Sequence, residues 1–119
     1  GLPLVQHALQ VLFDLAAKGE LTPELIVEKT SHAVADIFGI ADRGYVREGY
    51  FADLVLLDPQ APYNVNSTNL LAKCHWSPFE GHTFSSSIDT TIVNGEVAYS
   101  GGALTGKIAG RKLEFMRAR

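Results

Sequence analysis

The sequence predicts an α/β chain made of two unlike halves, with helices first and strands and loops after them. Through about the first forty residues, apolar residues recur at the three- and four-residue spacing of an amphipathic helix. From residue 53 onward, short apolar or alternating runs are separated by turn signals, which is the pattern of strands. The run 47–59, Arg-Glu-Gly-Tyr-Phe-Ala-Asp-Leu-Val-Leu-Leu-Asp-Pro, joins the two halves.

Length and composition limit the classes of protein to consider. The chain has 119 residues, 46% of them hydrophobic and 19% charged, which suits one domain with a modest core. A net charge of −3 predicts no binding to nucleic acid or to an acidic membrane surface, because both need clustered Lys and Arg. The single cysteine, Cys74, excludes an internal disulfide and is typical of a reducing compartment such as the cytoplasm. The sequence predicts neither a membrane helix nor a signal peptide.

The first predicted helix covers residues 3–18 and ends at Gly19. Because the chain starts with Gly1 and its apolar pattern begins without a capping signal, we expect a piece of a longer protein. An apolar face this wide predicts packing against more than one neighbour, as in the outer helices of α/β barrels. The face consists of Leu4, Val5, Ala8, Leu9, Val11, Leu12, Phe13, Leu15 and Ala16.

Two further helices are predicted before the joining run. Thr22 is placed as the N-cap of the second helix and Pro23 as its first residue, where the missing N–H costs nothing. Ser31 is expected to cap a third helix that runs through Phe38 and ends at Gly39. Three helices in about forty residues cannot form a good core alone, so we expect them to need a partner surface.

The strand predicted at residues 53–57 is almost wholly apolar. A run without alternation indicates burial on both faces, so we expect a central strand. Asp58-Pro59 ends it, because proline cannot donate to a sheet ladder.

The rest of the chain is predicted to consist of loops around one hairpin. Residues 87–93 alternate as a strand, Asn94-Gly95 is a hairpin turn, and residues 96–99 form the returning strand. Residues 60–69 are predicted as a polar loop, 70–74 as a short helical turn or strand, 76–81 as an aromatic loop, and 107–119 as a basic surface tail.

The four histidines do not predict a metal site. His7, His32, His75 and His82 contain no His-x-His pair and no i,i+4 pair with a second ligand. We assign His7 a structural or surface role and His32 a place at a helix end. Cys74-His75 with His82 would form only a weak site, so Cys74 is expected to be a buried small hydrophobe.

Other catalytic patterns are missing from the sequence as well. Residues 85–87 are three serines beside His82, but they lack the Gly-x-Ser-x-Gly elbow of a nucleophile. Residues 106–110 lack the ending of a phosphate loop. The carboxylates Glu80, Asp89 and Glu96 are scattered, so we expect them to be solvated. From the residues alone, no active site is predicted.

The order of motifs does resemble a known family. Residues 42–59, Asp-Arg-Gly-Tyr-Val-Arg-Glu-Gly-Tyr-Phe-Ala-Asp-Leu-Val-Leu-Leu-Asp-Pro, closely resemble the C-terminal segment of the amidohydrolase superfamily. Within it the chain is most similar to dihydroorotases of the cyclic-amide hydrolase group, on residues 1–9, 73–81 (Lys-Cys-His-Trp-Ser-Pro-Phe-Glu-Gly), 91–97 and 110–115. The resemblance implies the C-terminal helices of a (β/α)8 barrel in residues 1–43. It implies the C-terminal part of a small β-sandwich domain, with the tail, in residues 44–119.

The resemblance also implies an activity. Dihydroorotases are hydrolases with one or two zinc ions, and they reversibly convert dihydroorotate into N-carbamoyl-aspartate in pyrimidine biosynthesis. A zinc centre suits this task because it supplies hydroxide near neutral pH and polarises the carbonyl. The family's zinc ligands and its proton-shuttling aspartate precede the point where this chain starts. The resemblance therefore implies no catalytic or metal-binding residue here, and a fragment that is inactive alone.

Partners and a substrate contact are implied in the same way. The implied partners are the remainder of the parent chain, with its barrel and N-terminal strands, a small-molecule substrate, and further copies in a homo-oligomer. Backbone groups at Pro3 and Leu4 match a loop that contacts the substrate at the C-terminal face of the barrel. Leu4 stands where many relatives have glycine, and Ala33-Val34 where they often have Asn-Pro. The alternatives are an allantoinase or hydantoinase, and a non-catalytic dihydroorotase-like subunit that holds a partner such as aspartate transcarbamoylase.

Overall fold

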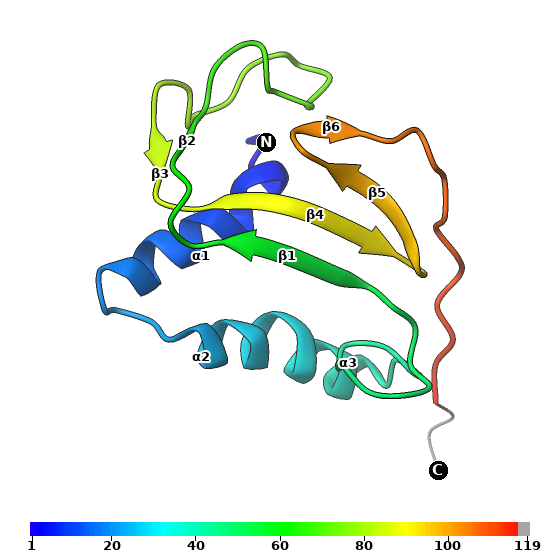
Figure 1. Ribbon diagram of the computed structural model, residues 1–119. Coiled ribbons are helices and arrows are strands. Elements are labelled where there is room, and N and C mark those ends of the chain that lie inside the picture. Colours follow the sequence, from blue (N-terminus) through cyan, green and yellow to red (C-terminus); the bar gives the residue numbers. More distant parts are fainter. Residues whose placement is uncertain (117–119) are drawn as a thin grey trace. The chain divides into compact units, whose positions relative to one another are not determined.

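The computed structural model describes residues 1–116, in which helices are followed by a mainly antiparallel sheet (Figure 1). This confirms the mixed α/β class. The helical elements are the 3-10 turn η1 (Val5–His7), α1 (Ala8–Ala17), α2 (Pro23–Val27), the π-helical η2 (Glu28–His32) and α3 (Ala33–Phe38). The strands are β1 (Leu54–Asp58), β2 (Tyr63–Asn64), β3 (Thr83–Phe84), β4 (Ser87–Val93), β5 (Glu96–Ser100) and β6 (Ala103–Leu104).

The contacts of the chain divide it into two compact units. Unit 1 contains Gly1–Thr22 and Leu57–Ile88, and unit 2 contains Pro23–Leu56 and Asp89–Arg119. The predicted boundary at residues 43 and 44 concerns the domains of a longer enzyme and stays a prediction. No helix of residues 1–116 combines the length and the apolar character that a membrane crossing requires.

The first helix is shorter than predicted and buries different residues. It starts as the 3-10 turn η1, which no side-chain hydrogen bond caps, and α1 ends at Ala17, before Gly19 with its φ of 78°. The most buried side chains of this segment are polar: His7 is 1% exposed and Gln10 is 3% exposed. None of the apolar residues of α1 is fully buried. The helix therefore packs a polar stripe against the rest of unit 1.

The second and third predicted helices are one continuous helical segment. Pro23 starts α2 as expected, but the separate helix capped by Ser31 was wrong, because η2 carries the helix on into α3 (Figure 1). A π-helical turn keeps the backbone hydrogen-bonded, so no new cap is needed. Gly39 ends α3 with a φ of 62°, as predicted.

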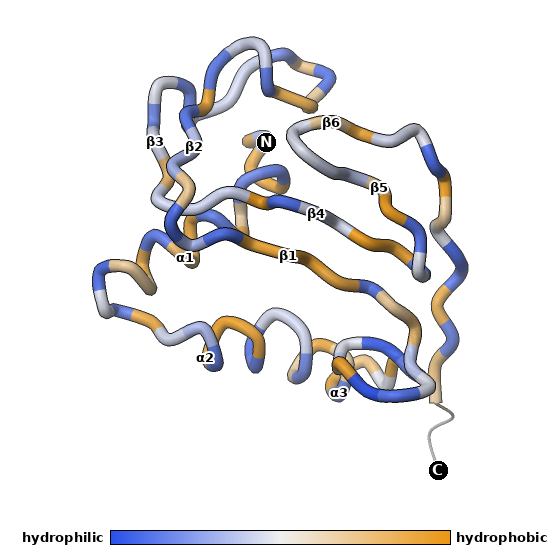
Figure 2. The backbone as a smooth tube through the Cα atoms, viewed as in Figure 1, coloured by the Kyte–Doolittle hydropathy of each residue, from blue (hydrophilic) through white to orange (hydrophobic). Residues whose placement is uncertain are grey.

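The first strand forms close to its predicted place, but it is not central. The order of the main sheet is β1-β4-β5-β6, so β1 lies at an edge. Figure 2 shows its apolar character, yet Val55 is 48% exposed and Leu56 is 51% exposed. The prediction of burial on both faces was therefore wrong within residues 1–116, where only Leu54 and Leu57 of this strand are partly buried.

The hairpin formed by β4 and β5 was predicted correctly. Asn94 and Gly95 join the strands with φ angles of 48° and 81°, and positive values at both positions define the type I′ turn. The register shifts between Thr91 and Ile92, which marks an irregularity in the ladder. The sequence did not predict the short strands β2, β3 and β6, and residues 70–74 contain only a turn.

The end of the described tail pairs with residues 39–41, which directly follow α3. Ile40 and Phe115 form an isolated antiparallel bridge. Beside it, the N–H of Ala41 donates to the carbonyl of Glu114 at 2.9 Å, and the N–H of Met116 donates to the carbonyl of Gly39 at 2.7 Å. The tail is largely exposed up to residue 116, as predicted. The end of that prediction, residues 117–119, lies outside the described residues.

Candidate functional site

The structure does not gather the histidines into a metal centre. Among residues 1–116, no group of three or more His, Cys, Asp or Glu side chains is placed to hold a metal ion. The donor set of the described residues therefore does not fit the zinc that the resemblance implies. No step of a zinc reaction is assigned to these side chains.

His7 lies in a buried aromatic cage. Its ring stacks on Phe84, with centroids 5.6 Å apart and planes at 23°, and it meets Phe79 edge-on at 5.9 Å. Neither ring nitrogen has a hydrogen-bond partner in the part of the chain that is described. Burial lowers the pKa of His7, so the neutral ring is favoured. His7 therefore has the structural role that was one of its two predicted roles.

Asp14 connects the end of α1 with the segment around β3. One of its carboxylate oxygens accepts hydrogen bonds from the amide and the hydroxyl of Ser85, both at 2.8 Å, and the other lies 3.1 Å from Nε2 of His82. Burial raises the pKa of Asp14, but the hydrogen bonds from Ser85 and His82 lower it by more.

A serine, an aspartate and a histidine thus meet, but their order is not that of a nucleophilic triad. In a triad the histidine stands between the other two and takes the proton of the serine. Here Asp14 stands between Ser85 and His82 and binds both of them. The prediction that residues 85–87 form no triad agrees with this geometry, and the cluster fastens the chain segments together.

Two glutamines of the same helical segment hold the chain in a similar way. The side-chain amide of Gln6 donates to the carbonyl of Asn69 at 2.7 Å and accepts from the N–H of Leu71 at 2.9 Å. Gln10 donates to the carbonyl of Ser86 at 2.9 Å. Sequence analysis missed this polar stripe because it followed the apolar residues. A polar repeat at residues 6, 7, 10 and 14, which share one helix face, was the available signal.

At Pro3 and Leu4, the two predicted substrate contacts, few backbone groups remain free. The N–H of Leu4 donates to the carbonyl of Leu2 at 3.0 Å, and the carbonyl of Leu4 accepts from the N–H of His7 at 3.4 Å. Proline has no N–H. Of the backbone groups of these two residues, only the carbonyl of Pro3 has no partner among the described residues.

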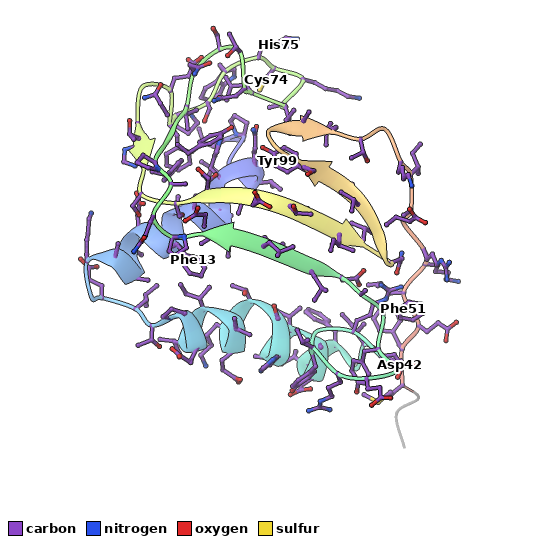
Figure 3. All side chains as sticks on the ribbon, viewed as in Figure 1. Phe13, Asp42, Phe51, Cys74, His75 and Tyr99 are labelled. Carbon is purple, nitrogen blue, oxygen red and sulfur yellow. The ribbon has the colours of Figure 1, made fainter. Side chains whose placement is uncertain are left out.

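Cys74 is exposed, so its predicted burial was wrong. It lies with His75 on the loop that joins β2 to β3 (Figure 3). Its Sγ contacts only the carbonyl of Trp76 among the hydrogen bonds of the described chain, at 3.7 Å. This loop has no helix or strand of its own.

The other candidate residues are scattered. His32 ends η2, stacks on Tyr45 with ring centroids 4.1 Å apart, and lies 3.4 Å from Glu28. The three carboxylates that were predicted to be solvated are exposed, as expected: Glu80, Asp89 and Glu96. At the two predicted substrate contacts the described residues thus offer one backbone acceptor without a partner, and elsewhere they form several structural clusters.

Comparison with known proteins supplies the class. The sequence profile of the amidohydrolase family matches residues 4–98, and the chain therefore belongs to this family. It is 36% identical over 107 residues to a dihydroorotase of Halobacterium salinarum, which covers 88% of this chain and 25% of that protein. It is also 36% identical over 121 residues to a D-phenylhydantoinase of Escherichia coli, which covers 100% of this chain and 26% of that protein.

A solved structure agrees with the sequence relatives. The structure of a D-hydantoinase matches with a TM-score of 0.80 at 27% identity, covering 90% of this chain and 24% of that one. The chain spans about a quarter of the length of these relatives. The resemblance to the amidohydrolase superfamily is confirmed, whereas the equal identity to a dihydroorotase and a hydantoinase does not select between them.

Proposed function

We propose that this chain is the C-terminal portion of a cyclic-amide hydrolase, and that dihydroorotate is the parent enzyme's substrate. The observation that carries the proposal is the family match over residues 4–98, with relatives named for dihydroorotate and for hydantoins. Both substrates contain a ring amide. In the proposed reaction, water adds to the ring carbonyl and the ring C–N bond breaks, so that dihydroorotate becomes N-carbamoyl-aspartate. The reverse reaction closes the ring and releases water.

The metal of the proposed enzyme would be bound outside this chain. One or two zinc ions would supply hydroxide near neutral pH and polarise the ring carbonyl. This chain would contribute the carbonyl of Pro3, the unpaired backbone acceptor of the predicted loop. A cyclic amide carries ring N–H donors, so an acceptor at this position matches its chemistry.

The exposed apolar surface supports the proposal that the chain belongs to a larger enzyme. Val5 is 92% exposed, Ile37 is 77% exposed and Val55 is 48% exposed. In the proposed parent, residues 1–43 belong to a (β/α)8 barrel and residues 44–119 to a small β-sandwich. The remainder of the parent chain would cover these side chains. We propose a homo-oligomeric, cytoplasmic enzyme acting on a small molecule.

The decisive assay uses the longest protein that the source gene encodes around residues 1–119. A chelator would remove bound metal from the protein, and Zn²⁺ would then be added back. The protein would be assayed with dihydroorotate, N-carbamoyl-aspartate, a 5-substituted hydantoin and allantoin. Zinc-dependent conversion of dihydroorotate is expected, while the 119-residue chain alone should convert none of them. Preference for another ring by more than about tenfold in kcat/KM would refute the dihydroorotase assignment.

A hydantoinase is the second candidate. Two observations favour it: the D-phenylhydantoinase match covers 100% of this chain, and the D-hydantoinase structure matches with a TM-score of 0.80. Turnover of hydantoins but not of dihydroorotate would select it. A parent that neither retains zinc nor opens any of these rings would instead be a non-catalytic subunit, and its partner would then be sought by co-purification.

A further inference from the structure

We propose that Gln6 is a positioning residue that fixes the backbone of Pro3 and Leu4 for substrate binding. This inference rests on the proposed function, because it needs a substrate at that loop. It goes further by assigning the orientation of the loop to one side chain, and by connecting the loop with residues 69–71.

The amide of Gln6 is engaged at both ends. Its nitrogen donates to the carbonyl of Asn69 at 2.7 Å, and its oxygen accepts from the N–H of Leu71 at 2.9 Å. Both distances are those of good hydrogen bonds. Two bonds made by one planar group fix its rotation as well as its place. The side chain thus pairs with a backbone segment as a neighbouring strand would.

The helix start has few other restraints. No side-chain hydrogen bond caps η1, and the bond from the N–H of His7 to the carbonyl of Leu4 is long, at 3.4 Å. Val5 is 92% exposed, so its side chain holds nothing in place within this chain. The contacts that tie this segment to later residues of unit 1 are the two bonds of Gln6 and the buried ring of His7. Only Gln6 connects it by hydrogen bonds to residues 69–71.

The proposal predicts a particular kinetic signature. A misplaced carbonyl at Pro3 would weaken binding of the substrate and of the transition state alike, which raises KM and leaves kcat unchanged. A loss of folding stability alone would reduce the fraction of active enzyme. That would lower the apparent kcat and leave KM unchanged. The two roles are therefore separable in one assay.

Gln10 provides a matched control. It comes from the same helical segment, is 3% exposed, and donates its amide to the carbonyl of Ser86 at 2.9 Å. In the full-length parent, we expect Gln6→Met to raise KM about tenfold at constant kcat, from the loss of its hydrogen bonds. Gln10→Met should lower thermal stability and leave KM within about twofold of the wild type. Gln6→Glu keeps the acceptor for Leu71 and should raise KM by less than Gln6→Met does.

Two results would overturn the proposal: a KM for Gln6→Met within about twofold of the wild type, or an equal rise of KM in Gln10→Met. Hydrogen exchange gives a readout that does not need turnover. The amide of Leu71 should exchange about tenfold faster in Gln6→Met and unchanged in Gln10→Met. If the wild-type parent opens no cyclic amide, the proposed function fails and the substrate role of Gln6 fails with it. The exchange rate of the Leu71 amide then still shows whether Gln6 forms its hydrogen bond to Leu71.

Discussion

The imidazole of His7 stacks on the ring of Phe84, with centroids 5.6 Å apart. The contact joins the start of unit 1 to β3, a later segment of the same unit. His7 behaves there as an aromatic side chain, since burial lowers its pKa and its nitrogens have no partner among the described residues. A histidine used in this way makes the stability of the unit depend on pH.

The first prediction concerns that dependence. The unfolded chain has the ordinary histidine pKa of 6.5, and the folded pKa is lower. Above 6.5 both states are neutral at this ring. As the pH falls below 6.5 only the unfolded state gains the proton, so stability is lost. Urea unfolding at about pH 7.5 and about pH 5.5 should show this loss, and His7→Phe should reduce it. The exposed His75, changed to Asn, should leave it intact.

The second prediction concerns Asp14, which accepts hydrogen bonds from Ser85 and His82. Asp14→Asn should lower the free energy of unfolding by about 2 kcal/mol, because bonds to a charged acceptor are lost. Since the folded pKa lies below the ordinary value of 3.8, this contribution exists above 3.8 and disappears as the pH falls toward the folded pKa. The control is Asp58→Asn, at an exposed site that accepts one hydrogen bond from the backbone N–H of Gln60. A cost as large there would contradict the account.

The third prediction uses two glycines with similar backbones. A Cβ at Gly44, where φ is +85°, would lie 2.5 Å from the Cβ of Ala35 and 3.0 Å from the carbonyl oxygen of Ser31. Gly49 has a φ of +82° and nothing within 4 Å. Gly49→Ala should cost about 1 kcal/mol from the left-handed backbone alone. Gly44→Ala should cost about 2 kcal/mol more because of the clash, as measured by thermal unfolding. Equal losses would refute the close approach.

The fourth prediction compares two ion pairs in unit 2. Arg43 pairs with Asp53, lies 4.0 Å from the ring centre of Phe51, and has a side chain that is 9% exposed. Arg43→Met should destabilise by about 1–2 kcal/mol, because the charged hydrogen bond is lost while Asp53, 35% exposed, keeps water and the N–H of Asn94. Lys107 pairs with Glu96, and their side chains are 64% and 52% exposed. Lys107→Met should cost less than about 0.5 kcal/mol in the same denaturation assay.

The fifth prediction concerns the chain alone. With β1 at the edge of the sheet and Val55 and Leu56 about half exposed, we expect the isolated chain to self-associate. Val55→Lys should shift it toward the monomer, because a charge at a sheet edge opposes further pairing. Val46→Lys, at a site that is 85% exposed and outside the strands, should have less effect. Light scattering after size exclusion measures both, and a clean wild-type monomer would count against the prediction.

The elements that the sequence predicted well are those defined by local chemistry. The type I′ turn requires two positive φ angles, which few dipeptides other than Asn-Gly adopt, so Asn94-Gly95 alone predicted the hairpin. Pro23 and Gly39 marked helix ends for similar reasons. The π-helical turn η2 carries no such signal, so a second helix start at Ser31 was inferred instead.

The errors share one physical cause: burial depends on what lies opposite. The apolar run of β1 predicts a central strand, yet β1 lies at an edge of the sheet and leaves Val55 and Leu56 about half exposed. The sequence predicts a buried Cys74, yet the residue is exposed on a loop that contains no strand or helix of its own. The polar stripe that includes Gln6 and Gln10 needed knowledge of residues 69–86, far along the chain. The residue pattern of a segment predicts which of its faces is apolar, but not which other segment packs against that face.

The bridge between Ile40 and Phe115 affects the order in which the chain can fold. During synthesis residues 39–41 emerge before their pairing partners at 114–116. Unit 2 therefore closes only when the ribosome has nearly finished this region, and contacts so distant in sequence are slow to form. A nascent chain would carry an open unit 2 while residues 42–113 are being synthesised. Ribosome pausing before residue 114 should then lengthen the time that chaperones remain bound.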